Sequence, residues 1–233
     1  MSANENALAT VDIAALQKAK FADDGFGDLS GPGFGAFLPY IQLCGSSTDL
    51  AKRGEIAVGN YALIIGSGDK KEHVDLGKNV ICIPVAWRPK AMNAKTNPVL
   101  ASFNPASPLF QQLRKTAEAD SQSGCMFGPE FLLWIPGHGF ATFHMGSKTA
   151  RNEARSVQAL LPGNDGRLKT ANLSAQFIKT EKYSWHGPKC VISSQVAEQP
   201  PAELMLQTVT DFLNPADSKP PETAAPEVVN QDR

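Results

Sequence analysis

The chain has 233 residues, 42% of them hydrophobic, and a formal net charge of −1. This length suits one sizeable domain with tails, and the near-neutral charge by itself indicates no class of partner. The sequence contains no apolar run of about 18 residues, which excludes a membrane-spanning helix. The opening Met1–Lys20 also lacks the basic and apolar stretches of a secretory signal, so we expect a cytoplasmic protein without membrane contact.

The first part of the chain is expected to pass from an arm into strands. In residues 1–36 a short amphipathic helix, N-capped by Thr10, precedes a flexible glycine-dense arm. Apolar and β-branched runs then predict three strands, with a polar connection between the second and the third. The strands are expected at 37–45, 54–66 and 78–89, and the connection at 68–77.

The second part alternates strands and helices. Two apolar runs joined by Pro136–Gly139 predict a hairpin. The tail is rich in proline, alanine and acidic residues, so it cannot bury enough apolar surface and is predicted to be disordered. The expected segments are an insertion at 90–128 with a helix at 108–120, the hairpin at 130–146, a helix at 147–161, strands at 167–185 and 187–196, a helix within 196–213, and the tail at 214–233.

About seven mostly antiparallel strands with one packed amphipathic helix indicate a mainly β protein whose domain spans 37–195. A small closed or partly open barrel is the most economical arrangement, because closure removes exposed strand edges. A two-sheet sandwich with an insertion is the alternative.

The cysteines are far apart and form no CxxC pair, which favours free, buried thiols in a reducing compartment. They are Cys44, Cys82, Cys125 and Cys190. His186 and Cys190 could share one strand face, but zinc sites usually contain closer ligand pairs. We therefore predict no metal and no cofactor.

The expected helix at 147–161 carries three cations on one side. At about 100° per residue, Lys148, Arg151 and Arg155 fall within about 60° of one another, opposite an alanine and valine face. Such a stripe is either an ordinary solvated helix face or a surface for phosphates. The charge of the whole chain favours the second reading, because residues 51–190 hold 18 basic and 10 acidic side chains between two acidic ends.

The next segment adds aromatic rings to this basic surface. Between 145 and 190 there are 8 basic and 3 acidic residues, and Tyr183, Trp185 and His186 lie among them. Cations that follow phosphates and rings that stack on bases are typical of single-stranded nucleic-acid binding. By the strand period of two, Tyr183 and Trp185 share one face and His186 the other. A tryptophan at a strand end, such as Trp185, is more often a core residue than a stacking platform. A second, weaker patch lies where the third strand leaves the sheet, with Trp87, Arg88, Lys90 and Lys95.

No catalytic motif is present: the sequence has no P-loop, GxGxxG, HExxH or GxSxG. Glu130 and Glu153 lie in different predicted elements, so paired carboxylates for acid–base chemistry are not indicated. We therefore predict that the protein is not an enzyme.

Three stretches together resemble a known layout. They are FLPYIQLCGSSTDLAKRGEIAVGNYALI, FATFHMGSKTARNEARSVQALL and FIKTEKYSWHGPKCVIS. Over residues 37–195 the chain is similar to bacteriophage-encoded single-stranded DNA-binding proteins with an OB-type barrel. In that layout a Trp-x-x-Pro turn joins the closing strand pair. The resemblance implies an OB-like antiparallel barrel that binds single-stranded DNA without strong sequence preference, in phage replication or recombination in the host cytoplasm.

Many proteins of that kind recruit replication or recombination partners through an acidic tail. The tail here has four acidic residues, but it also carries Lys219 and ends on Arg233. It lacks a dense acidic tip. The sequence leaves the oligomeric state open, a homo-oligomer included.

The predicted DNA-binding residues are the cations and rings described above. They are Lys148, Arg151, Arg155, Lys169, Lys179, Lys182, Tyr183, Trp185, Lys189, Trp87, Arg88 and Lys90. Two other classes of function remain open. One is a β-rich virion or scaffold protein, and the other is an accessory partner of a recombinase or nuclease.

Overall fold

The computed structural model describes residues 38–66, 71–96, 99–163 and 166–214. The arm expected at 1–36 and the tail expected after Asn214 lie outside these ranges. The elements in chain order are β1 (Tyr40–Leu43), α2 (Asp49–Lys52), β2 (Tyr61–Ile65), β3 (Glu72–Gly77), β4 (Asn79–Asn93), β5 (Leu100–Ser102), α3 (Pro108–Ala119), β6 (Cys125–Ile135), β7 (Gly139–His144), α4 (Lys148–Gln158), β8 (Ala171–Lys179), β9 (Ser184–Ile192) and α5 (Ala202–Leu213).

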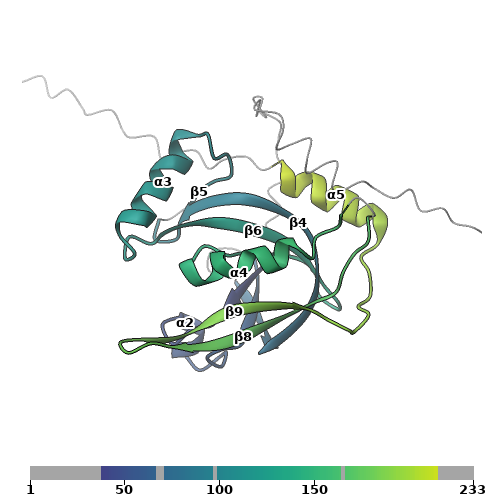
Figure 1. Ribbon diagram of the computed structural model, residues 1–233, viewed down its shortest axis with the longest axis horizontal. Coiled ribbons are helices and arrows are strands. Elements are labelled where there is room, and N and C mark those ends of the chain that lie inside the picture. Colours follow the sequence, from purple (N-terminus) through teal and green to yellow (C-terminus); the bar gives the residue numbers. More distant parts are fainter. Residues whose placement is uncertain (1–37, 67–70, 97–98, 164–165, 215–233) are drawn as a thin grey trace, which may run out of the picture.

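The strands form one mixed sheet of nine strands, which confirms a mainly β protein (Figure 1). Its order is β3-β2-β1-β7-β6-β4-β8-β9, and β5 pairs with one edge of β4. Only β1 and β7 pair in parallel; the other described pairs are antiparallel. Within the described residues the sheet does not close on itself, so the expected barrel is not confirmed.

The sheet nevertheless curls around one core. The 15-residue strand β4 shifts register between Pro84 and Ala86, an irregularity of the kind that bends a strand. The buried Tyr61 of β2 reaches across the core and donates its hydroxyl to the carbonyl of Ser174 in β8, at 2.9 Å. Strands that are far apart in the sheet order therefore face each other across the same cluster of apolar side chains.

Helix α4 packs against the core between β6 and β9. Its Ala150, Ala154 and Val157 are buried in the core cluster. Two of its charged side chains bind backbone groups of different strands. The Arg151 guanidinium donates to the carbonyl of Phe127 in β6 at 3.0 Å, and the Glu153 carboxylate accepts the N–H of Cys190 in β9 at 3.0 Å. Buried backbone groups need such partners, so α4 satisfies groups that no neighbouring strand pairs.

Helices α5 and α3 pack against other parts of the sheet. Val209, Phe212 and Leu213 of α5 form a second apolar cluster with residues of β4, β6 and β7. Phe110 and Leu113 of α3 cover the far end of β4. Serine hydroxyls cap the N-termini of α3 and α4, as is typical of well-formed helix starts: Ser107 accepts from Phe110 N–H and Ser147 from Ala150 N–H. Among the described helices, none is long and apolar enough to cross a membrane.

The three helices expected at 108–120, 147–161 and 196–213 are confirmed as α3, α4 and α5, and all four cysteines are free, as expected. Cys125 is only half-buried, whereas the other three are buried. The strands differ more from expectation. The polar connection predicted at 68–77 was wrong, because Glu72–Gly77 forms β3, an edge strand whose polar side chains face solvent. Strands β4 and β6 extend into the region expected to be an insertion.

The strand predicted at 167–185 was also wrong, because the chain turns earlier. The turn lies at Thr180–Tyr183 rather than at a Trp-x-x-Pro turn. There the Thr180 N–H donates to the Tyr183 carbonyl at 2.8 Å, and the Tyr183 N–H donates to the Thr180 hydroxyl at 3.1 Å. Trp185 and His186 therefore belong to β9, and Pro188 lies within that edge strand, where proline is tolerated.

Candidate nucleic-acid interface

The three cations predicted on α4 do not share one environment. Lys148 and Arg155 are exposed, and their side chains make no hydrogen bond or ion pair within the described part of the chain. Arg151 is half-buried. Besides the Phe127 carbonyl it donates to the carbonyl of Gly146, and its guanidinium lies 4.2 Å from the centre of the Phe127 ring. Burial also lowers the pKa of Arg151. The solvent-facing stripe of α4 thus consists of Lys148 and Arg155, and Arg151 holds the helix in place.

The β8–β9 hairpin extends past the start of α4 and past α2 in Figure 1. Its turn carries Lys182 and Tyr183 together with Glu181, and Lys179 ends β8 just before the turn; all four are exposed. Tyr183 is the most open aromatic of the described residues, at 73% exposure. The tip of the hairpin is therefore basic and aromatic, as the sequence predicts, although its boundaries differ from those expected.

Trp185 is not a core residue. It is 37% exposed, and its indole N–H donates to the hydroxyl of Thr149 at 3.3 Å. Thr149 is the second residue of α4, so the indole lies beside the first turn of the helix, the turn that begins with the exposed Lys148. Gly187 allows this close approach, because a Cβ at that position would lie 2.7 Å from the Thr149 methyl group. A tryptophan held at its polar end and open on part of its surface suits stacking on a flat ligand.

The opposite face of the hairpin carries another aromatic pair. Phe177 pairs across the strands with His186, and their ring centres lie 5.3 Å apart with a tilt of 54°. Phe177 is 58% exposed. On its other side the His186 ring contacts Gly59, where a Cβ would lie 3.0 Å from the imidazole. The sequence analysis did not select Phe177. With the turn at Thr180–Tyr183, Phe177 lies opposite His186 in the neighbouring strand. The sequence does not show this pairing until the position of the turn is known.

Lys169 and Lys189 have structural partners. The Lys169 ammonium donates to the carbonyl of Ala159 at 3.4 Å, at the C-terminal end of α4, where positive charge is favourable. The Lys189 ammonium lies 3.5 Å from the Glu153 carboxylate, and both side chains reach solvent. An ion pair of this kind contributes little and can exchange partners. Lys189 therefore stays available to a phosphate, whereas Lys169 belongs mainly to the helix end.

Arg88 and Lys90 belong to a buried ion cluster instead of a surface patch. Both bind the Glu130 carboxylate, each with an N–O distance of 2.6 Å, and Glu130 is 1% exposed. Burial alone would raise the pKa of Glu130, but the charges of Lys90 and Arg88 outweigh it and lower the pKa to about 2. Arg88 also donates to the carbonyl of Phe212 in α5. The third member of that predicted patch, Trp87, packs partly buried against the core. Arg88 and Lys90 join β4 to β6, and Arg88 also joins β4 to α5.

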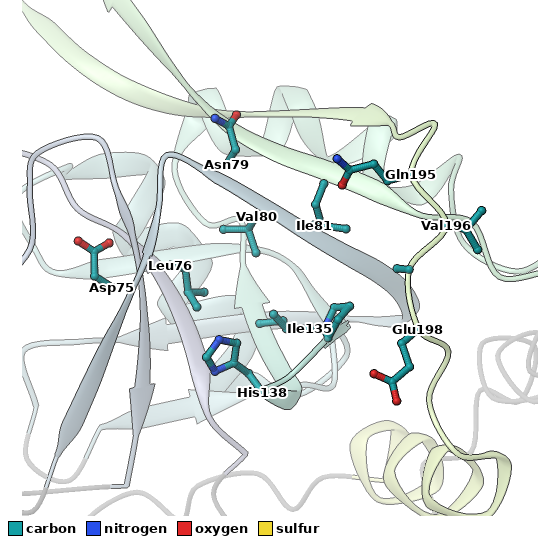
Figure 2. Close-up of a pocket in the computed structure, with 12 residues that line it drawn as sticks. Asp75, Leu76, Asn79, Val80, Ile81, Ile135, His138, Gln195, Val196 and Glu198 are labelled. Atoms are coloured by element: carbon teal, nitrogen blue, oxygen red, sulfur yellow. The ribbon is translucent and has the colours of Figure 1, made fainter.

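A pocket of about 430 Å³ lies at the opposite end of the β8–β9 pair from the turn (Figure 2). Its floor is apolar, with Val80, Ile81 and Ile135, and its rim carries the carboxylates of Asp75 and Glu198. Two negative charges repel phosphate. The pocket is therefore a poor site for nucleic acid, and it is not part of the candidate interface. The described residues contain no group of three His, Cys, Asp or Glu side chains that could hold a metal ion.

Comparison of this chain with protein-family models, with curated proteins and with solved structures finds no match. Function is therefore inferred from the surface formed by α4 and the β8–β9 hairpin. That surface combines free cations with open aromatic rings.

Proposed function

We propose that the protein binds single-stranded DNA without strong sequence preference and acts in phage DNA replication or recombination as a non-enzymatic component. The observation that carries this proposal is the position of Trp185, half-open and hydrogen-bonded to Thr149 next to the exposed Lys148. In the same proposal the curled sheet is an OB-like, partly open barrel, and α4 fills the gap between its edges.

The chemistry of the surface fits a flexible polyanion with flat bases. Cations of α4 and the hairpin would contact phosphates, while Trp185 and Tyr183 would stack on bases, each stack contributing about 1–3 kcal/mol. Stacking of this kind needs bases whose faces are free, which a duplex does not offer. The phosphate-binding residues of the proposal are Lys148, Arg155, Lys179, Lys182 and Lys189.

Tryptophan fluorescence tests the proposal directly. The chain has three tryptophans, and Trp134 and Trp87 are buried or partly buried, so Trp185 should report most of a ligand's effect. We expect a poly-pyrimidine DNA strand to quench the fluorescence at low salt, and the quenching to weaken at about 0.2 M salt. A Trp185→Phe variant keeps a stacking ring and should bind within a few-fold while losing the quenching. If the unaltered protein shows neither quenching nor a retarded band on a gel, DNA binding is contradicted.

One observation favours the second class, a virion, scaffold or accessory protein. The end of β9 and the segment after it expose Val191, Ile192 and Val196, at 46%, 66% and 95%. Exposed apolar side chains in one short segment often mark protein contacts. Stable high-order assembly in the absence of nucleic acid, measured by light scattering after gel filtration, would support that class.

A further inference from the structure

The β8–β9 hairpin carries aromatic side chains on both of its faces. Ile178 pairs with Trp185 and the next pair is Phe177 with His186. Successive residues of a strand point to opposite sides. Trp185 therefore faces α4, where it binds Thr149, and His186 faces the loop of Gly59. The hairpin thus has two aromatic faces, and the ring pair of Phe177 and His186 lies on the face away from α4.

The ring pair on the second face is built in a way that leaves Phe177 open. The His186 ring is fixed between Gly59, which has φ of 88° and no Cβ, and the Phe177 ring. Phe177 itself remains 58% exposed, although a phenylalanine gains by burial. Within the described fold the aromatic neighbour of Phe177 is His186, and the remaining surface of the Phe177 ring is open to a ligand.

Charged side chains accompany the rings on both faces. By the period of two, Lys179 lies on the face of Phe177, and Lys189 lies on the face of Trp185. The turn between them carries Lys182 and Tyr183, together with Glu181 as the one acidic side chain. Each face therefore has one cation and one open ring, and the basic, aromatic turn connects them.

We propose that a single DNA strand crosses the tip of the hairpin and stacks on both faces, on Trp185 and Tyr183 on one side and on Phe177 and His186 on the other. This inference rests on the proposed function and adds a second subsite to it. It predicts that the affinity for DNA rises once the oligonucleotide is long enough to reach both faces. A short oligonucleotide can occupy only the Trp185 face, whereas a longer one reaches Phe177 and gains affinity.

The test uses the full chain and a ladder of oligo-dT from about 4 to about 20 nucleotides, which spans the site sizes common for one barrel. We expect Phe177→Ala to leave the affinity for the shortest DNA that binds unchanged and to lower the affinity for the longest about 5- to 150-fold, as loss of one stack would. Phe177→Trp should restore it. Ile192→Ala is the matched control, because Ile192 lies on the same face at the other end of β9 and is 66% exposed.

The outcomes separate the inference from the proposed function. If Phe177→Ala binds every length like the unaltered protein, which still shows Trp185 quenching, the second subsite is overturned and DNA binding stands. A loss of equal size at all lengths overturns it too, because Phe177 would then share the Trp185 subsite. Absence of binding by the unaltered protein overturns both. Should Phe177→Ala unfold, Phe177→Leu keeps the apolar volume without the ring face and gives the same readout.

Discussion

At the scale of single residues, the buried polar groups of β4, β6 and β7 are the part of the molecule that sequence inspection missed. Glu130 was visible only as an isolated glutamate. Its partners are 42 and 40 residues away in sequence, and they meet it because the β4–β6 register places Arg88 opposite Glu130. Register is a long-range property, so no local pattern could show this cluster. For the same reason the sequence suggested Arg88 and Lys90 as surface cations.

His144 gives a testable consequence of that cluster. Burial lowers the pKa of this imidazole to about 4, helped by the charge of Lys90 and opposed by Glu130. Arg151 adds a smaller repulsion. In the unfolded chain the same group titrates near pH 6.5. Between these two values the unfolded state binds more protons, so we expect stability to fall as the pH drops from about 6.5 to about 4, by on the order of 3 kcal/mol.

Urea unfolding measured across this pH range, with His144→Gln beside the unaltered protein, checks the expectation. The variant should lose most of the slope between pH 6.5 and pH 4. Below that range both proteins should still lose stability, because protonation of Glu130 removes its ion pairs. An unchanged slope in the variant would show that His144 is not the titrating group.

At the scale of elements, the three longer helices were predicted well, the four-residue α2 was not predicted, and strand boundaries were predicted poorly. The period of α4 is a local feature and is found as the sequence indicates, although Ser147, expected as the first helical residue, is the N-cap. Strand β3 was missed because its polar residues look like a loop until β2 supplies their backbone partners. The turn of the β8–β9 hairpin was missed because Gly187–Pro188 is the stronger local turn signal. The actual turn is held by hydrogen bonds between Thr180 and Tyr183, which the sequence does not show.

The two arginines of α4 allow a matched experiment on one helix. Arg151→Ala leaves the Phe127 carbonyl without its partner and removes the ring contact, so we expect a loss of about 1–3 kcal/mol in the free energy of unfolding. Arg155 is exposed and makes no such contact, so Arg155→Ala should change stability by less than about 0.5 kcal/mol.

In DNA titrations the order of the two variants should be reversed, so that the variant with the smaller loss of stability has the larger loss of affinity. Arg155→Ala should weaken binding of a poly-pyrimidine strand, whereas Arg151→Ala should have the smaller effect at a temperature where it is folded. Equal losses of affinity without a loss of stability in Arg151→Ala would return Arg151 to the binding surface, where the sequence placed it.

At the scale of the whole molecule, the sequence showed a basic middle between acidic ends, but it could not show which cations face outward together. That depends on how the sheet curls. Tyr61 ties β2 to β8, and α4 packs along β9. Lys148 and Arg155 stay exposed on α4, while Arg88 and Lys90 turn inward. Closure of the sheet into a barrel would depend on the same curl. The described sheet stays open.

The salt dependence of DNA binding tests this division of charge. For single strands, each phosphate contact contributes about 0.7 to the slope of log affinity against log salt concentration. We expect the double variant Lys148→Gln with Arg155→Gln to reduce that slope by about 1.4. Removing two cations from another region, Lys95→Gln with Lys115→Gln on the loop after β4 and on α3, changes the net charge equally and should leave the slope nearly intact. Equal reductions in both double variants would mean that the net charge of the molecule, rather than the surface of α4 and the hairpin, attracts the DNA.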